Sequence, residues 1–264
     1  MFDNCVSLSN IIFPSVVEEI GDNAFRNCEN LIQCEFPSLK KLGNSAFRNC
    51  KNMNSINIGE TYIIGNYCFM GCRKLEKVLF SFTDIEMVIS RIGDYAFANC
   101  ELLEDFAIET QTTLRSKTVS GSVGAGAFFG CKKIRSQIDL YSMEEVGDYC
   151  FASSGFTISF GQFLNYSVSC NIGKHAFEGC KISGDSFYDV DLTNVKKVGD
   201  YAFSGCIFYD TGFLLFGDNL IEVGAHAFTN FHNLERIEID QPENSLDLSN
   251  AGIPSSCDVV WNGQ

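Results

Sequence analysis

The 264-residue sequence has little positive charge, little proline and no long apolar run. Nineteen Lys and Arg stand against 33 Asp and Glu, so the net charge is -14. A negative excess repels phosphate backbones, and nucleic-acid binding is therefore not expected. No stretch approaches the roughly 18 apolar residues of a membrane-spanning helix, so membrane insertion is not expected. The first residues carry Asp3 and no basic segment, so we expect no secretory signal there.

The sequence is instead rich in Phe and Cys, with 24 and 13 residues, and these follow a repeat. The segment Ile20–Cys28 has the pattern [ILV]-G-x-x-[AC]-F-x-x-C, and Phe2–Cys5 matches its end, so the chain begins within a repeat. Further copies lie at Leu42–Cys50, Ile64–Cys72, Ile92–Cys100, Val123–Cys131, Val146–Ser154, Ile172–Cys180, Val198–Cys206 and Val223–Phe231. Nine copies in register indicate a repeat protein.

A second block follows each motif, as in Leu31, Cys34 and Phe36 after Cys28. Its alternation of apolar and polar residues predicts a short strand with one buried face. The G-x-x-A-F segment is too short for a long helix and predicts a single helical or 3₁₀ turn. One such unit cannot bury its own apolar face, so we expect stacked units with parallel strands and Phe packed on Phe.

These motifs resemble the BspA-like leucine-rich repeats over about residues 1–240. The resemblance implies an α/β-type repeat solenoid: a right-handed arc with a parallel sheet on its concave side and the short helical turns opposite. It also implies a surface-exposed protein of the adhesion type, located outside the cell or on its surface. The arc would contain about ten repeats, the first of them partial. Residues 241–264 leave the pattern and are expected to form a C-terminal cap, with Val259–Trp261 as a final strand.

The cysteines and histidines fit the repeat better than they fit a reactive site. Eight cysteines share one repeat position and are expected to be buried free thiols. Cys68 and Cys72 have the spacing of half a metal site, but no second pair matches them. His175 and His226 fall where other copies have Tyr, which predicts a half-exposed aromatic column. We therefore expect no catalytic, cofactor or metal site, and no enzyme.

Two sets of residues remain as candidates for partner binding. Segments 81–91, 109–122 and 161–171 are insertions at one place in the repeat, typical of a binding edge or of neutral length variation. The second set comprises the outward strand residues, which are mostly short, polar or acidic and fit a polar protein partner as well as a solvated surface. They are Asn10, Gln33, Glu35, Ser55, Asn57, Lys77, Asp105, Asp139, Thr157, Ser159, Asp189, Asp191, Arg236 and Glu238.

The sequence predicts a non-enzymatic scaffold that recognises a protein or a cell-surface partner. The alternative is a structural spacer in a surface or phage-tail assembly, with no ligand of its own. The two hypotheses differ in whether the insertions and outward strand residues contact a partner.

Overall fold

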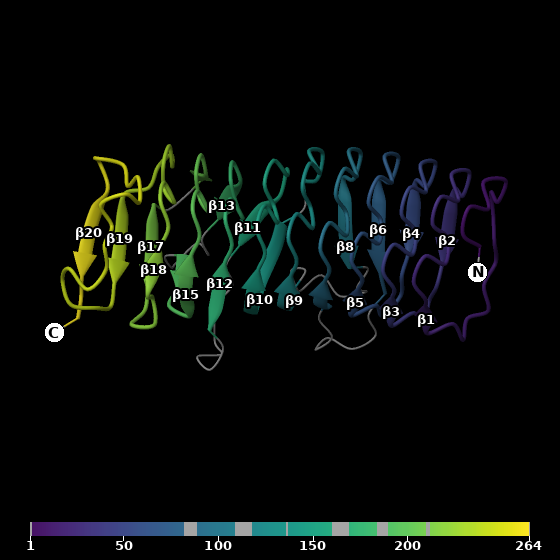
Figure 1. Cartoon of the computed structure of the whole chain (residues 1–264), viewed down its shortest axis with the longest axis horizontal. Coiled ribbons are helices and arrows are strands. Elements are labelled where there is room, and N and C mark those ends of the chain that lie inside the picture. The colour runs from purple at the N-terminus through teal and green to yellow at the C-terminus, as the bar shows by residue number, and fades with distance from the viewer. Residues whose placement is uncertain are drawn as a thin grey trace.

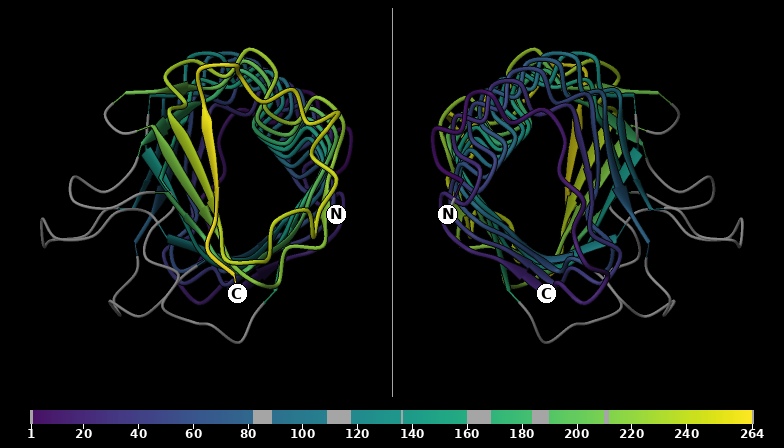
Figure 2. Two further views of the ribbon diagram at one scale, coloured as in Figure 1. Left: turned by 90° about the vertical axis from the view of Figure 1, so that its left-hand side faces the viewer. Right: turned by 90° about the vertical axis from the view of Figure 1, so that its right-hand side faces the viewer.

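A computed structural model describes residues 2–81, 89–108, 118–135, 137–159, 169–183, 190–209 and 212–263. The chain coils into a stack of similar turns, with its two termini at opposite ends of the long axis (Figure 1). Viewed end on, the turns superimpose (Figure 2). The glycines that mark successive turns are 22 to 31 residues apart. The stack is therefore the predicted solenoid, about nine turns long.

In the described part of the chain all strand pairs are parallel, as predicted, but they form three sheets instead of one. The first four-stranded sheet contains β2 (Gln33–Glu35), β4 (Ser55–Asn57), β6 (Lys77–Phe80) and β8 (Asp105–Ile108). The second contains β14 (Val190–Leu192), β17 (Phe213–Phe216), β19 (Arg236–Ile239) and β20 (Asp258–Trp261). β20 is the final strand expected in the C-terminal segment, and it pairs with β19.

The third sheet has twelve strands and includes the residues just before each repeat glycine. Its strands are β1 (Glu19–Ile20), β3 (Lys41–Leu42), β5 (Ile63–Ile64), β7 (Ile89–Ile92), β9 (Thr118–Val123), β10 (Gln137–Val146), β11 (Thr157–Ser159), β12 (Cys170–Ile172), β13 (Lys181–Ser183), β15 (Val195–Val198), β16 (Ile207–Phe208) and β18 (Glu222–Val223). β10 is long enough to pair with β11 through its first half and with β12 through its last residues. Each turn thus has two strand positions: the first follows the motif, and the second lies just before the next repeat glycine. β10 spans both positions and joins them in a single sheet.

The expected helical or 3₁₀ turns are absent from the described residues, where each G-x-x-A-F-x-x-C segment is a pair of hydrogen-bonded turns. The reason lies in the backbone. The second x and the residue before Cys have positive φ in every copy, for example 56° at Asn23 and 58° at Asn27. A right-handed helical turn cannot contain such residues. The handedness of the coil and the concavity of a sheet face stay predictions.

Phenylalanine rings form a continuous stack through the core, as the repeat predicted. Ring centroids of neighbouring turns are 5.1–5.8 Å apart, with planes within 20° of parallel. The stack consists of Phe2, Phe25, Phe47, Phe69, Phe97, Phe128, Phe151, Phe177, Phe203 and Phe228. Each inner ring is covered on both faces, so its burial depends on the two adjacent turns.

The repeat glycines are needed for close approach between turns. A Cβ at Gly147 would lie 2.4 Å from the backbone nitrogen of Ala125 and 2.5 Å from the carbonyl carbon of Gly124. The same relationship holds at every repeat glycine from Gly43 onward, whereas a Cβ at Gly21 of the first copy would have no atom within 4 Å. The glycine column is therefore set by packing against the preceding turn.

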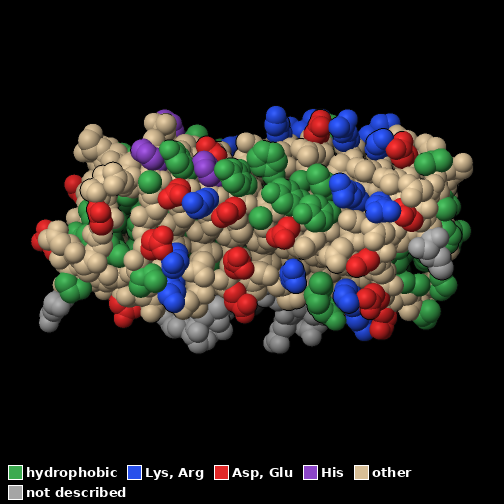
Figure 3. Space-filling view, viewed as in Figure 1, with side chains coloured by type: hydrophobic (Ala, Val, Ile, Leu, Met, Phe, Trp, Pro, Cys, Tyr) green, Lys and Arg blue, Asp and Glu red, His purple; other side chains and the backbone are tan. Residues whose placement is uncertain are grey.

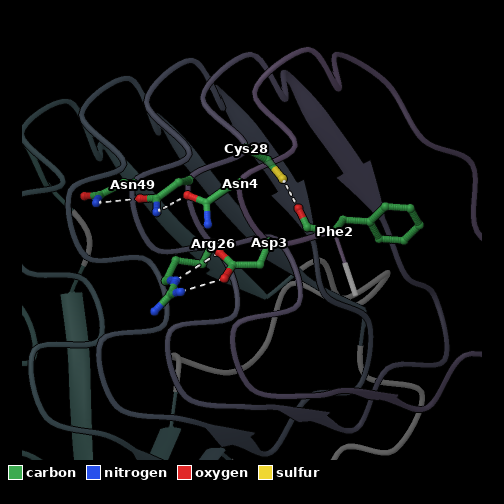
Figure 4. Close-up of polar contacts among 7 residues, drawn as sticks. Phe2, Asp3, Asn4, Arg26, Cys28 and Asn49 are labelled. Atoms are coloured by element: carbon green, nitrogen blue, oxygen red, sulfur yellow. Dashed lines mark hydrogen bonds and ion pairs between the residues drawn. The ribbon is translucent and has the colours of Figure 1, made fainter.

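The repeat cysteines hydrogen-bond to the turn before them. The Cys28 thiol donates to the carbonyl oxygen of Phe2 over 3.0 Å (Figure 4). The same bond, 3.0–3.3 Å long, is made to the preceding repeat Phe by Cys50, Cys72, Cys100, Cys131, Cys180 and Cys206. These cysteines are thus donors for a buried carbonyl group, in addition to being small apolar residues.

All thirteen cysteines are free thiols, and eleven of them are buried. Burial raises the pKa of the Cys28 thiol to about 11 and that of Cys131 and Cys180 to about 12. The prediction of burial is wrong for Cys5, which is exposed, and Cys257, outside the repeat, is half-buried. Cys5 lies in the partial repeat at the N-terminal end of the described stack.

Candidate partner-binding surfaces

The outward residues of the first four-stranded sheet stand in register across its strands. Gln33, Ser55, Lys77 and Asp105 form one row, and Asn10 joins it through a bridge to Gln33. Glu35 and Asn57 form a second row. The residues between the two rows, such as Cys34 and Ile56, are buried. The structure therefore brings seven of the fourteen predicted residues together on one sheet.

The other predicted residues lie on different sheets. Asp139 pairs with Ser159 between β10 and β11, and Thr157 is two residues before Ser159. Asp191, Arg236 and Glu238 belong to the second four-stranded sheet. Asp189 lies outside the described residues. The predicted set is therefore divided among three sheets.

Two of the predicted polar residues use their side chains to hydrogen-bond to the turn that follows them in the chain. The Asn57 side-chain oxygen accepts a hydrogen bond from the Gly59 backbone nitrogen over 3.0 Å. The Asp191 carboxylate accepts from the backbone nitrogen and the hydroxyl of Thr193, over 2.9 and 2.7 Å. Such local bonds stabilise the turn that follows a strand. Asn57 and Asp191 are thus less available to a partner than exposed Gln33 and Glu35.

A small polar network occupies the C-terminal sheet. The Arg236 Nε lies 3.0 Å from a carboxylate oxygen of Glu238. This nitrogen is buried, and none of the described residues offers it a hydrogen bond of good geometry. The Asn262 amide donates to the other Glu238 oxygen over 3.2 Å. Arg236 thus compensates the charge of Glu238, while Asp191 and Asp258 leave the strands of this sheet net negative.

The predicted insertions are shorter than expected at their C-terminal ends. Residues 89–91, 118–122 and 170–171 belong to β7, β9 and β12 of the twelve-stranded sheet. The remaining parts, 82–88, 109–117 and 160–168, lie outside the described residues. Each connects a strand of the first strand position to a strand just before a repeat glycine, as the sequence predicted.

The aromatic column predicted from the Tyr and His positions is confirmed. Its members are Tyr67, Tyr95, Tyr149, His175, Tyr201 and His226. Tyr67 and Tyr95 stack with centroids 5.6 Å apart, and the last four members stack at 4.6–4.9 Å. His175 Nδ1 also lies 2.9 Å from a carboxylate oxygen of Glu178. Gly126 occupies the column between Tyr95 and Tyr149.

An open groove of about 380 Å³ runs beside this column. The glycines of the fourth to eighth motif copies form its floor. Its charged walls comprise Arg91, Asp94, Glu145, Asp148, Lys174, Lys197 and Glu222. The groove was not predicted from the sequence, although a column of repeat glycines beside charged residues is the pattern that produces it.

Among the described residues, no group of three or more His, Cys, Asp and Glu side chains is placed to hold a metal ion. No helix in the described part is long and apolar enough to cross a membrane.

The stacked turns, parallel sheets and core Phe ladder define a leucine-rich-repeat solenoid. The model for the "BspA type Leucine rich repeat region" matches residues 1–122, 92–181 and 170–251. The chain therefore belongs to the BspA-type leucine-rich repeat family.

Solved structures of bacterial leucine-rich proteins are similar to this chain at low identity. A leucine-rich repeat protein from Bacteroides ovatus is 19% identical, with 95% of this chain and 91% of that chain covered and a TM-score of 0.34. The leucine-rich repeat protein of T. pallidum is 17% identical, over 83% and 75% of the two chains, with a TM-score of 0.37. A leucine-rich cell surface protein from Faecalibacterium prausnitzii is 15% identical, over 97% and 87%, with a TM-score of 0.36. No curated protein matches this chain significantly.

Proposed function

We propose that this chain is a non-enzymatic recognition scaffold that acts outside the cell or on its surface and binds a protein or cell-surface partner. Membership in the BspA-type family supports this proposal, and a similar solved structure is described as a cell surface protein. The observation that carries it is the row of Gln33, Ser55, Lys77 and Asp105, held in register on one sheet. A rigid row of exposed and half-exposed polar side chains presents fixed hydrogen-bonding groups to a partner.

The experiment compares binding of fluorescent protein to cultured epithelial cells and to immobilised extracellular-matrix proteins. The sheet variant carries Glu35→Ala, Lys77→Ala and Asp105→Ala. Its matched control carries Arg73→Ala, Glu101→Ala and Lys132→Ala, all exposed residues just after the repeat cysteines. We expect the sheet variant to lose at least tenfold in affinity and the control to bind like the parent.

A second set of variants tests the insertions. In each variant one of the three segments 82–88, 109–117 and 160–168 is shortened, so that the connection approaches the five residues between Ile58 and Ile64. Loop closure depends weakly on length, so the trimmed proteins should keep their thermal stability. If binding is lost here and kept in the sheet variant, the insertion edge is the site. If the parent binds neither cells nor matrix proteins, the recognition proposal is wrong and the structural spacer is the better description.

A further inference from the structure

Three tyrosines of the aromatic column, together with Phe129, form a patch of exposed apolar side chains on the outer face. Tyr67, Tyr95, Phe129 and Tyr149 are 37–42% exposed and belong to consecutive turns. Figure 3 shows hydrophobic side chains gathered at the centre of this face, between Lys and Arg toward the N-terminal end and His toward the C-terminal end. Exposed Tyr and Phe grouped in this way are typical of protein-binding surfaces.

The tyrosines of the patch occupy backbone positions that do not suit them. Tyr67, Tyr95 and Tyr149 have φ of 57°, 51° and 55°. At the other positive-φ position of the motif, before each Cys, the chain uses only Asn, Gly or Ser. Bulky residues are uncommon in this region, and residues in sparsely populated backbone regions are concentrated at functional sites. The choice of Tyr in place of Asn therefore indicates a use for the rings.

The groove beside the patch carries an excess of unpaired carboxylates. Lys174 pairs with Asp200 over 2.9 Å, and Lys197 pairs with Glu222 over 2.7 Å. Among the described residues, Asp94, Glu145 and Asp148 have no ion-pair partner, and only Arg91 of the groove walls is an unpaired cation. Oδ1 of Asp94 and of Asp148 accepts a backbone hydrogen bond from the next turn, and Asp94 Oδ2 also accepts a 3.5 Å bond from the Asn66 amide, so an arginine would share these carboxylates with the fold. Asp94 and Asp148 directly precede Tyr95 and Tyr149 in the chain. Negative charge thus adjoins the exposed rings.

The protein already places a guanidinium against this column. The Arg48 guanidinium carbon lies 5.7 Å from the centre of the Tyr67 ring, at the N-terminal end of the aromatic column. Arg combines stacking on aromatic rings with bidentate hydrogen bonding to carboxylates. Aromatic rings beside unpaired carboxylates form a surface to which arginine side chains are complementary.

We propose that the groove and the aromatic patch form a docking surface for an arginine-bearing segment of a partner protein. Arginine side chains enter the groove over the repeat glycines, pair with Asp94, Glu145 and Asp148, and stack against the exposed tyrosines. This inference deepens the proposed function, because it adds a second binding face and states the chemistry of its partner.

The test is titration of the full chain with a fluorescent octa-arginine peptide and, in parallel, with octa-lysine. The variant Tyr95→Asn/Tyr149→Asn keeps every charge. Asn is tolerated at positive φ, so the midpoint temperature of unfolding should be unchanged or higher. We expect its affinity for octa-arginine to fall about tenfold and its preference for arginine over lysine to disappear. Tyr201→Asn, at the same motif position but outside the patch, is the matched control and should bind like the parent.

A second variant, Asp94→Asn/Asp148→Asn, tests the carboxylates. Asn44 and Asn66 occupy the same motif position and accept the same backbone hydrogen bond from the next turn, so the fold should be kept. We expect both peptides to bind at least fivefold more weakly, and the control Asp22→Asn to change little. The proposal is wrong if the tyrosine variant binds octa-arginine like the parent, or if Tyr201→Asn weakens binding equally. Because the peptide is a fixed probe, this result does not depend on whether cell or matrix binding is found.

Discussion

The thiol of Cys72 donates a hydrogen bond of 3.1 Å to the carbonyl oxygen of Phe47, which lies 25 residues earlier in the chain. That carbonyl belongs to the turn between two positive-φ residues, Ser45 and Asn49. The same carbonyl also accepts the Cys50 backbone N–H over 3.1 Å. Replacing Cys72 by Ala therefore removes one of its two donors, at a cost of about 0.5–1.5 kcal/mol. Urea midpoints should show this loss, while Cys5→Ala, at an exposed position, should stay within about 0.5 kcal/mol. Equal shifts would mean that the thiol bond contributes nothing.

Alkaline pH should destabilise the fold through its buried thiols. The pKa of Cys131 and Cys180 is raised by burial to about 12, from a reference value of 9.0. Above about pH 9 the unfolded chain loses these protons first, so ionisation favours unfolding. The stabilisation is complete below pH 9 and is lost as the pH rises toward 12, by about 1.4 kcal/mol per pH unit for each such thiol.

Urea unfolding in reductant at pH 7, 9 and 10.5 measures this dependence. The parent should begin to lose stability by pH 9, where the unfolded thiols are half ionised, and should lose much more by pH 10.5. The variant Cys131→Ser/Cys180→Ser should lose less over the same interval. A midpoint that is constant to pH 10.5 would contradict the assigned directions of the thiol pKa shifts.

Phe97→Ala should be severely destabilising. The Phe97 ring stacks on Phe69 and Phe128 at 5.1 Å on either side, and it meets the edge of Phe106 at 5.4 Å. Its removal leaves a cavity between two turns, and we expect a loss of about 3–5 kcal/mol in denaturant unfolding. The matched control is Gln33→Ala on an exposed strand position, expected within about 0.5 kcal/mol. Asn57→Ala is a poor control, because its side chain bonds to the Gly59 backbone.

Two glycines of the same motif position should respond oppositely to alanine. Gly147→Ala places a Cβ within 2.4–2.5 Å of the preceding turn's backbone, and such overpacking costs about 1–3 kcal/mol or more. Gly21→Ala meets no atom within 4 Å and should be neutral or slightly stabilising. Thermal unfolding of the two variants provides the comparison. A similar loss in both would show that backbone conformation, and not contact between turns, selects glycine here.

The sequence predicted the features that depend on burial periodicity. The Phe stack, the strands after each motif and the final strand near Trp261 were all identified from spacing, because each places apolar side chains at fixed intervals. The positive-φ residues were not recognised, although the run of Asn, Gly and Ser before each Cys carried that signal. Without it, the turns were predicted as helical.

Contacts between turns were harder to predict than the turns themselves. The thiol bond from Cys72 to Phe47 and the contact of Gly147 with Gly124 join residues of different repeats, so no pattern within one repeat contains them. The same limit explains why the predicted outward residues are divided among three sheets. Strand Gln137–Val146 is continuous across two strand positions, which redirects pairing after the fifth motif copy.

The alignment of the turn-to-turn hydrogen bonds with the long axis has a mechanical consequence. Bonds such as Phe47 N–H to the Cys68 carbonyl and Phe69 N–H to the Ala96 carbonyl join one turn to the next, and the two termini lie at opposite ends of the stack. Tension applied between the termini therefore pulls along these bonds. It breaks them one turn at a time and does not shear all of them together. Each turn that detaches, with its 22–31 residues, releases about 70–110 Å of chain. A protein stretched at a surface would yield in small steps while its remaining turns stay folded.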